Sequence, residues 1–451
     1  MSTVATYIAQ NRFGLGAAST DTATLEDPRI WLKSQVNRDA TAGPSGFRSS
    51  AAILEDIHGT RNARKEKLGP IVKKSYRTDF APEVLARAQQ MVTTNTPFAE
   101  RMVLFWSNHF TVSNAKRVIG PALPAFEREA IRPHVFGRFA DMLKASSRHP
   151  VMLSYLDNDV SVGENSFAGR RQRSRTGAEK TINENLAREI LELHTLGVNG
   201  GYSQQDVIEL AKAISGWSHG GIRPRRDPKP VHGEFEFKDY FHEPGAKTIL
   251  GKAYRNDGER QGLAVLDDLA RHPATADFIA TKLVRHFVAD NPPPDAVASI
   301  SSVFRRTGGD LASVSLALID LEEAWKDPTP KVKNHYEFLI STHRALGNDT
   351  LRPGDVFEPL EEFGQFPFSA PSPAGWGDLS SDWLAPEALM RRVEWVRSRS
   401  ARLPGTWVPD EFLEHTIGPV AYDATRTWVS RAPSGNSAMA IVLASPEFQR
   451  R

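Results

Sequence analysis

Hydrophobic residues recur with helical spacing along most of this chain, and residues 181–197 show the pattern most clearly. Thr181 and Glu184 are spaced as a capping box at the start of this segment, and Gly197 is placed as a left-handed stop at its end. One apolar stripe follows from a rotation of about 100° per residue, and it consists of Ile182, Leu186, Ile190 and Leu193. The pattern therefore predicts one amphipathic helix over 181–197.

Three polar residues of this segment fall inside its apolar arc. Asn183, Glu189 and His194 would point toward a core, where a polar side chain costs stability unless it is paired. Such groups mark either a functional site or a structural polar cluster, and the pattern alone leaves both open. Glu189 and His194 are five residues apart, about 140° around an α-helix, so they cannot chelate one ion as an i, i+4 pair does.

The rest of the chain repeats the helical pattern with few interruptions. Helices are expected over 80–110, with Thr96-Pro97 starting one of them, and across 257–348. Two more are expected at 386–400 and 435–450. The β signal is confined to 235–251, where 235–242 and 247–251 read as a hairpin around a Pro-Gly turn. We therefore predict a mostly α fold, multi-helical and globular, with a minor β-hairpin near 235–251, in one large helical domain over 1–451.

Two segments break the periodicity. Residues 159–180 are rich in Gly, Ser and Arg, and they are expected to form a mobile basic loop at the mouth of the 181–197 helix. Such a loop is either a lid or an insertion without a role. Residues 349–380 are rich in Pro, Gly and Phe and show no period, so they are expected to form an irregular wrap over the surface.

Composition narrows the function classes. The 451 residues are 40% hydrophobic and 24% charged with a net charge of +2, so no nucleic-acid partner is expected. The absence of cysteine excludes disulfides, thiolate metal sites and cysteine nucleophiles. No apolar run approaches the roughly 18 residues that a membrane span requires, so no transmembrane segment is expected. The N-terminus lacks the pattern of a signal peptide, so the chain alone is expected to be cytoplasmic.

Long motifs spread over the chain resemble those of the bacterial domain of unknown function 1800 family. The longest is NENLAREILELHTLGVNGGYSQQDVIELAKAISGW, which starts at Asn183. Further blocks are NRFGLGA (11–17), FWSNHF (105–110), YLDN (155–158), FHEPGAKTILG (241–251), HPATADFIATKLVRHFV (272–288), GQFPFSAPSPAGW (364–376) and the terminal LASPEFQRR. The resemblance runs nearly end to end. The chain is therefore identified as a full-length member of that family.

Because the family is uncharacterised, the resemblance implies a source and a genomic companion but no reaction. It implies bacterial origin and a frequent genomic companion, a second family that resembles alkaline phosphatases. Many members of both families are exported. A phosphatase-like companion is therefore a candidate partner, and co-export with a partner that carries the signal is the expected route out of the cell.

Common catalytic motifs are missing from the sequence. There is no G-x-S-x-G nucleophile elbow, no Walker A loop and no His-Glu-x-x-His zinc motif. What remains is a set of residues suited to acid–base work or metal binding. The candidate site residues are Glu189, His194, His109, Asn183 and His242, with His286 as a further histidine.

The candidates for a divalent metal are Glu189, His194 and His109, with ligands drawn from different helices. A buried Glu189 needs a partner, for which Arg285 and Lys282 are candidates. The tryptophans 106, 217 and 376 could stack a sugar or fill a core.

Two function classes stay open. One is an enzyme with a carboxylate–imidazole site in a helical cleft, with or without a metal, acting on a cell-surface or exported substrate. The other is a non-catalytic accessory or binding partner of the phosphatase-like companion. The enzyme hypothesis predicts that Glu189, His194 and His109 converge on a pocket. The accessory hypothesis predicts an exposed apolar patch and core polar groups that pair off.

Overall fold

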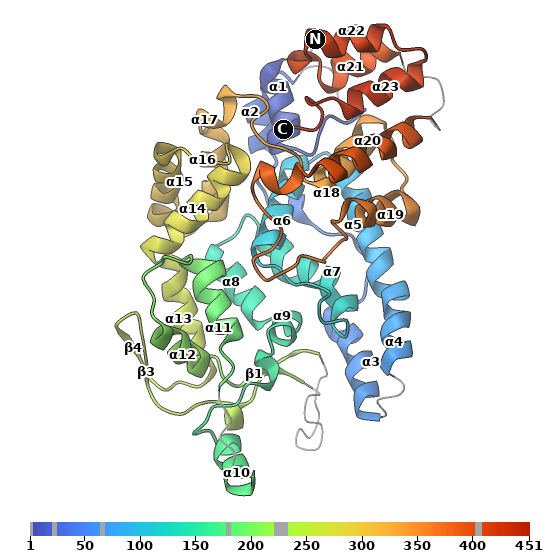
Figure 1. Ribbon diagram of the computed structural model, residues 1–451. Coiled ribbons are helices and arrows are strands. Elements are labelled where there is room, and N and C mark those ends of the chain that lie inside the picture. Colours follow the sequence, from blue (N-terminus) through green and yellow to red (C-terminus); the bar gives the residue numbers. More distant parts are fainter. Residues whose placement is uncertain (1–2, 20–24, 64–67, 177–181, 221–232, 402–407) are drawn as a thin grey trace.

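The computed structural model describes residues 3–19, 25–63, 68–176, 182–220, 233–401 and 408–451. Helices dominate these residues, which confirms the mostly α fold (Figure 1). The N-terminal half holds α1 (Val4–Ile8), α2 (Pro28–Lys33), α3 (Ser50–Ala63), α4 (Leu68–Ser75), α5 (Ala81–Thr93), α6 (Pro97–His109), α7 (Leu123–Phe126), α8 (Phe139–Arg148) and α9 (Pro150–Tyr155). The centre holds α12 (Gln204–Ala213), α13 (Glu259–Arg271), α14 (Pro273–Phe287), α15 (Pro294–Thr307), α16 (Leu311–Asp320) and α17 (Glu323–Lys326).

The C-terminal part returns to the N-terminus. Its helices are α18 (His335–Ala345), α19 (Pro353–Phe363), α20 (Pro386–Ser400), α21 (Pro409–Thr416), α22 (Asp423–Ser430) and α23 (Gly435–Ala444). In Figure 1 the red C-terminal helices lie beside the blue α1 at the top of the molecule. The hydroxyl of Tyr7 joins the two ends by donating to the Glu447 carbonyl oxygen at 3.0 Å. No helix in the described ranges is both long and apolar enough to span a bilayer.

The predicted strands exist, but they do not pair with each other. In the described ranges β1 (Trp217–His219) pairs antiparallel with β2 (Phe235–Phe237), and β3 (Lys247–Ile249) pairs antiparallel with β4 (Lys252–Tyr254). The sequence predicted a hairpin between the segments that became β2 and β3. The short helical turn at Asp239–Phe241 lies between those two strands, so each takes a different neighbour.

Two hydrophobic clusters hold most of the buried apolar side chains of the described residues. The larger joins α3, α6, α8, α9 and the central helices, and the smaller joins α18 to the C-terminal helices. Helix α6 begins at Pro97, as predicted, and buries residues on nearly all of its faces. Phe98, Phe105 and Trp106 are all buried. This position lets α6 form a wall of any cavity between the clusters.

The predicted 181–197 helix is shorter and partly of another kind. It consists of α11 (Asn185–Glu189) followed by a π-helix over Ile190–Thr195. Thr181 lies outside the described residues, so the capping box is not described. Gly197 has φ of +81°, and a Cβ there would lie 2.8 Å from the Phe278 ring, as expected for a glycine stop.

The two segments predicted as irregular each contain a helix. Within 159–180, residues Phe167–Thr176 form α10, which projects at the bottom of Figure 1. Within 349–380, residues Pro353–Phe363 form α19, so only the part after it is irregular. Residues 364–383, which we call the strap, run from the end of α19 to the short helix Ser380–Trp383. The strap covers one end of α6 and positions the site described next.

Candidate binding pocket and the buried histidine pair

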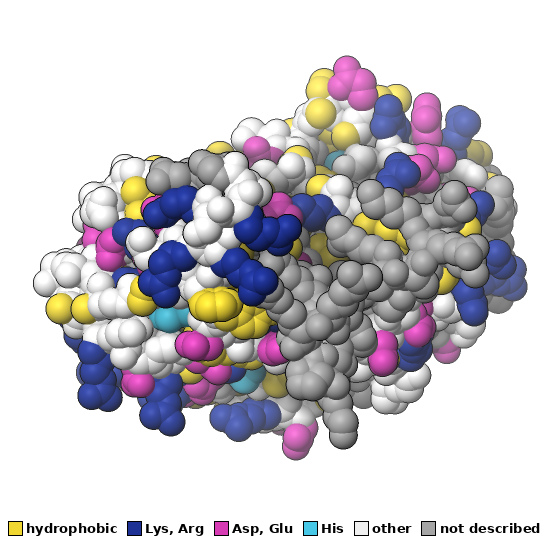
Figure 2. Space-filling model, turned by 90° about the horizontal axis from the view of Figure 1, so that it is seen from below, with side chains coloured by type: hydrophobic (Ala, Val, Ile, Leu, Met, Phe, Trp, Pro, Cys, Tyr) yellow, Lys and Arg dark blue, Asp and Glu magenta, His cyan; other side chains and the backbone are white. Residues whose placement is uncertain are grey.

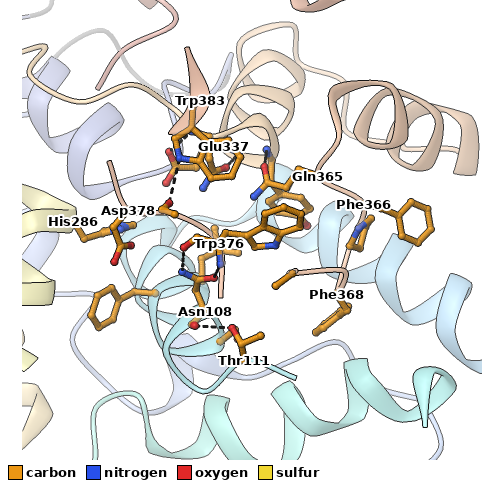
Figure 3. A pocket seen from close by; sticks show the side chains of 18 of the residues that line it. Asn108, Thr111, His286, Glu337, Gln365, Phe366, Phe368, Trp376, Asp378 and Trp383 are labelled. Atoms are coloured by element: carbon orange, nitrogen blue, oxygen red, sulfur yellow. Dashed lines mark hydrogen bonds between the residues drawn. The ribbon is translucent and has the colours of Figure 1, made fainter. Parts of the chain in front are cut away.

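A cavity of about 120 Å³ lies between four parts of the fold (Figure 3). Helix α6 supplies Phe105 and Asn108, α14 supplies Lys282 and His286, and the segment that enters α18 supplies lysine, tyrosine and glutamate side chains. The strap closes the remaining side. These parts are far apart in the sequence, so the cavity exists only after the two hydrophobic clusters have packed.

The strap is fixed to α6 by a two-way amide clamp. The Trp376 N–H donates to Asn108 Oδ1 at 2.7 Å, and Asn108 Nδ2 donates to the Trp376 carbonyl at 3.0 Å. Gly375 has φ of +84°, and a Cβ there would lie 2.6 Å from the Asn108 carbonyl oxygen. Only glycine allows this approach. The clamp therefore sets the position of Trp376 in the pocket wall.

Aromatic rings make up much of the lining. They come from α6, α18 and the strap: Phe105, Tyr336, Phe366, Phe368, Trp376 and Trp383. The rings of Trp376 and Trp383 lie 6.1 Å apart with an interplanar angle of 50°. Trp106 and Trp217, the other two candidates for stacking, are fully buried in the core. Trp376 is the one of the three predicted tryptophans that lines the cavity.

The charges on the lining are mostly positive. Among the described residues that line the cavity, four side chains are cationic and two are carboxylates: Arg87, Lys282, Lys331 and Arg451 against Glu337 and Asp378. Arg87 is bound by Glu127 at 2.7 Å, and Lys331 is bound by Asp290 and by the Asp378 carbonyl oxygen. These two cations have partners of their own.

Glu337 is shared by two buried guanidinium groups. It lies 2.6 Å from Arg101 and 3.0 Å from Arg451, and all three side chains are buried. Burial alone would raise the pKa of Glu337, but Arg451 and Arg101 together hold it below its usual range. Behind this trio, burial and then Arg101 lower the pKa of Lys333 to about 7. The floor of the cavity therefore carries more positive than negative charge.

Lys282 is the cation with the weakest partner in the pocket. Its side chain is 13% exposed, and the Asp378 carboxylate lies 3.9 Å from its ammonium group. Its ammonium also lies 5.9 Å from the centroid of the Phe278 ring. Burial, against the attraction of Asp378 and with the help of Arg285, lowers the pKa of Lys282.

His286 lies one helical turn after Lys282 on α14. Burial first, and then the charge of Arg451, lower its pKa well below the usual range, so its ring is neutral. Its Nε2 is buried and has no hydrogen-bond partner among the described residues. The ring packs against Phe105 at a centroid distance of 5.5 Å. A neutral imidazole that lines a cavity can accept or donate a proton there.

The structure brings together two of the predicted site residues. His109 Nε2 lies 3.1 Å from the His194 carbonyl oxygen, and the two rings are 6.2 Å apart. Both residues are almost completely buried, with exposed fractions of 2% and 1%. His109 therefore lies next to His194 in the core. Burial lowers the pKa of His194 to about 3 and that of His109 well below its usual range, so both rings are neutral.

Glu189 does not join this pair. It is half-buried rather than buried, and within the described residues its side chain forms no ion pair or hydrogen bond. Neither predicted partner, Lys282 or Arg285, reaches it; Lys282 faces Asp378 instead. The prediction that Glu189 is buried was wrong: Glu189 is the last residue of the short helix α11, next to the charged Arg188, and its side chain is only partly covered. Burial still raises the pKa of Glu189 to about 6.

Asn183 and His242 lie at other places in the fold. The Asn183 amide donates to the Asp157 carbonyl at 3.0 Å, and its Oδ1 caps the start of α11. His242 is buried, and its Nδ1 lies 2.9 Å from the Ser215 carbonyl oxygen after α12. Burial lowers the pKa of His242. Neither residue lines the cavity.

The predicted enzyme site therefore does not converge as expected. Glu189, His194 and His109 do not line the cavity, although Phe105 and Asn108 of the His109 helix do. Across the described part of the chain, no group of three or more His, Asp and Glu side chains is arranged to hold a metal ion. The described residues thus supply no ligand set for the divalent metal that the sequence allowed.

The sequence analysis missed most of the residues that line the cavity. Lys282 and Trp376 were named for other reasons, while Glu337 and Asp378 were not considered. One signal was present: the blocks 272–288 and 364–376, which carried the family resemblance, include Lys282, His286 and the strap up to Trp376. Their helical or irregular patterns did not show that they meet.

Comparison with known proteins places the chain by sequence. No curated protein and no solved structure matches it. A family model matches residues 8–450, which is nearly the whole chain. The chain belongs to the family described as "Protein of unknown function (DUF1800)".

Proposed function

We propose that this protein is an enzyme that binds an anionic small molecule in the cavity and acts on it by acid–base chemistry. The substrate class is an acidic sugar unit of a cell-surface or exported polymer. The single observation that carries the proposal is the excess of buried positive charge on the lining and floor of the cavity. The site is a carboxylate–imidazole site in a helical cleft, with His286 and Asp378 in place of the residues predicted from the sequence.

The charge balance favours an anionic ligand. Burying most of an ammonium group costs several kcal/mol of desolvation, unless a close anionic or polar partner offsets that cost. The Lys282 ammonium has only a carboxylate at 3.9 Å, and Lys333 behind it has no carboxylate within hydrogen-bond distance, only Asn11 and Ser341 at 3.3 Å. A bound anion would supply the missing charge and would stabilise the folded chain by mass action.

The aromatic lining favours a ligand with a flat apolar face. Trp376 and Phe366 are half-buried and line the cavity with one side accessible. Aromatic rings offer large contact area to the apolar face of a sugar, while nearby amides and charges bind its polar edge. Figure 3 shows Trp376 next to Asn108, with Gln365 on the same wall. A cavity of about 120 Å³ suits one sugar unit or a smaller molecule.

His286 and Asp378 are the groups that could move protons. His286 is neutral and its Nε2 has no partner in the described residues. Asp378 is partly exposed and faces Lys282. A neutral imidazole and a carboxylate in one cavity can each act as a general base, and each can return the proton as a general acid in a later step. Glu337 serves instead to fix Arg451 in the lining.

A second candidate function, the accessory role, is favoured by one surface. Helix α10 carries Arg170, Arg171, Arg173 and Arg175, and its first residue, Phe167, is 57% exposed. Figure 2 shows Lys and Arg side chains gathered beside hydrophobic atoms on this face. Such a face fits an acidic partner surface. In this proposal the partner is the phosphatase-like companion, and the two proteins leave the cell together on the companion's signal.

Titration calorimetry with D-glucuronate and with D-glucose tests the enzyme proposal. We expect glucuronate to bind and glucose to bind at least about tenfold more weakly, since one lost charge contact is worth more than about 1.4 kcal/mol. Lys282→Met should abolish the difference between the two sugars. Lys74→Met, which removes an exposed lysine of α4, should not change it. Equal affinity for both sugars, or a preference that survives Lys282→Met, would overturn the proposal.

A further inference from the structure

Lys282 differs from every other cation on the cavity lining. Arg87 and Arg451 each have a carboxylate at 3.0 Å or closer, and Lys331 donates to two oxygen acceptors. Lys282 has no hydrogen bond within the described residues, and its carboxylate lies at 3.9 Å. A lysine with a purely structural role would be expected to have closer hydrogen-bond acceptors, because a buried ammonium group without them destabilises the fold.

The surroundings of Lys282 lower the pKa of its amine below that of an exposed lysine. The groups that face it are Asp378, which favours the charged amine, and Arg285, which disfavours it. The charge of Lys282 helps to lower the pKa values of the buried rings of His109 and His194, which are both neutral. A lysine becomes a nucleophile when it is desolvated or lies next to another cation. Both conditions hold here.

We propose that Lys282 is a nucleophilic amine that forms an imine with an anionic carbonyl compound bound in the cavity. This inference rests on the proposed function, and it narrows the substrate to the open-chain carbonyl form of an acidic sugar or to a small oxo acid. The surrounding cations hold the carboxylate of this compound. Its carbonyl carbon is then presented to the Nζ of Lys282.

The reaction balances with the groups present. Lys282 first gives a proton to Asp378, and the freed lone pair forms a C–N bond while the C=O π pair moves to oxygen. That oxygen takes the proton back from Asp378. A second proton then leaves nitrogen for the hydroxyl group, the C–O bond breaks, and water departs as the C=N bond forms. The products are a protonated imine and water, so the positive charge beside Asp378 is retained.

Reductive trapping tests the inference. The full-length protein is treated with glyoxylate and cyanoborohydride at about pH 6, where an ordinary lysine with a pKa of about 10.4 is protonated. Hydride adds to the imine carbon and leaves a carboxymethyl group on the amine, which peptide mass spectrometry locates. We expect Lys282 to be modified severalfold faster than Lys74, because its lowered pKa leaves a larger fraction of the amine neutral.

Two variants keep the test decisive. Lys282→Arg keeps the charge but forms no stable imine, so it should keep glucuronate binding and lose the fast modification. Lys74→Arg should leave the rate at Lys282 unchanged. If glucuronate binds but Lys282 reacts no faster than Lys74, the imine is refuted while the proposed function survives. If neither binding nor fast modification is seen, both fail.

Discussion

The buried carboxylate of Glu337 offers a quantitative test of the charge network under the cavity. Glu337→Gln keeps the size of the side chain and removes the charge that Arg101 and Arg451 share at 2.6 and 3.0 Å. At an effective dielectric constant of about 20, each pair at about 3 Å is worth about 5 kcal/mol before desolvation. Desolvation offsets part of this, so we expect a loss of about 3–5 kcal/mol, the usual cost of breaking a buried pair.

A matched exposed pair serves as the control. Glu322 lies 2.8 Å from Arg29, a similar distance, but the two side chains are 69% and 34% exposed. Glu322→Gln should therefore have little effect on the free energy of unfolding, because water screens an exposed ion pair. Urea unfolding at neutral pH, followed by circular dichroism, measures both variants. If Glu337→Gln lowers the free energy of unfolding no more than Glu322→Gln does, the Glu337 charge does not stabilise the fold by pairing with Arg101 and Arg451.

The difference in stability between the wild type and Glu337→Gln should also change with pH in a defined direction. The folded-state pKa of Glu337 lies below its unfolded value, so its contribution is complete above the unfolded pKa of about 4.3. It is lost as the pH falls below that value toward the folded-state pKa. The difference in stability between the wild type and Glu337→Gln should therefore shrink below about pH 4. A difference that grows on acidification would contradict the assigned direction.

Three further outcomes follow from the structure. Burial raises the folded-state pKa of Glu189 to about 6, so its ionisation opposes folding as the pH rises to 6. Above pH 6, Glu189→Gln should therefore be more stable than the wild type by on the order of 1 kcal/mol. Below about pH 4 the two proteins should be equally stable, as measured by urea unfolding. A less stable variant at neutral pH would mean that Glu189 has a partner. His194→Leu removes a buried ring whose nitrogens have no partner in the described residues, so it should keep or raise the melting temperature. His109→Leu should lower stability by about 1 kcal/mol, because it loses the hydrogen bond to the His194 carbonyl. If His194→Leu is the more destabilising of the two, His194 has a hidden partner. Replacing the four arginines of α10 with Ser should slow association with an acidic partner protein in surface plasmon resonance without lowering the melting temperature, and a large thermal loss would make the helix structural.

Local signals predicted much of the fold. Pro97 acts within the first turn of α6, and the structure begins this helix where that signal lies. The same holds for α20, whose bounds agree with the predicted range 386–400. Caps and helical periodicity are properties of neighbouring residues, so one sequence is enough to find them.

Other features depend on contacts that a single sequence does not show. The π-helix over Ile190–Thr195 changes the rotation between Glu189 and His194, and a 3.6-residue pattern contains no sign of it. The pairing of β2 with β1 rather than with β3 depends on tertiary contacts. The cavity joins Lys282 of α14 to Asp378 of the strap, and only the packing of the strap on α6 brings them together. Two of the predicted residues, His109 of α6 and His286 of α14, therefore lie on helices that line the cavity, whereas Glu189 is not part of its lining.

The central claim is that the cavity holds an anionic ligand, and a crystal structure of the protein soaked with D-glucuronate tests it most directly. We predict electron density for the sugar in the cavity, with its carboxylate next to Lys282 and its ring facing Trp376. The same soak of Lys282→Met should leave the cavity without that density. Glucuronate bound only elsewhere on the protein, or bound equally in both crystals, would contradict the account.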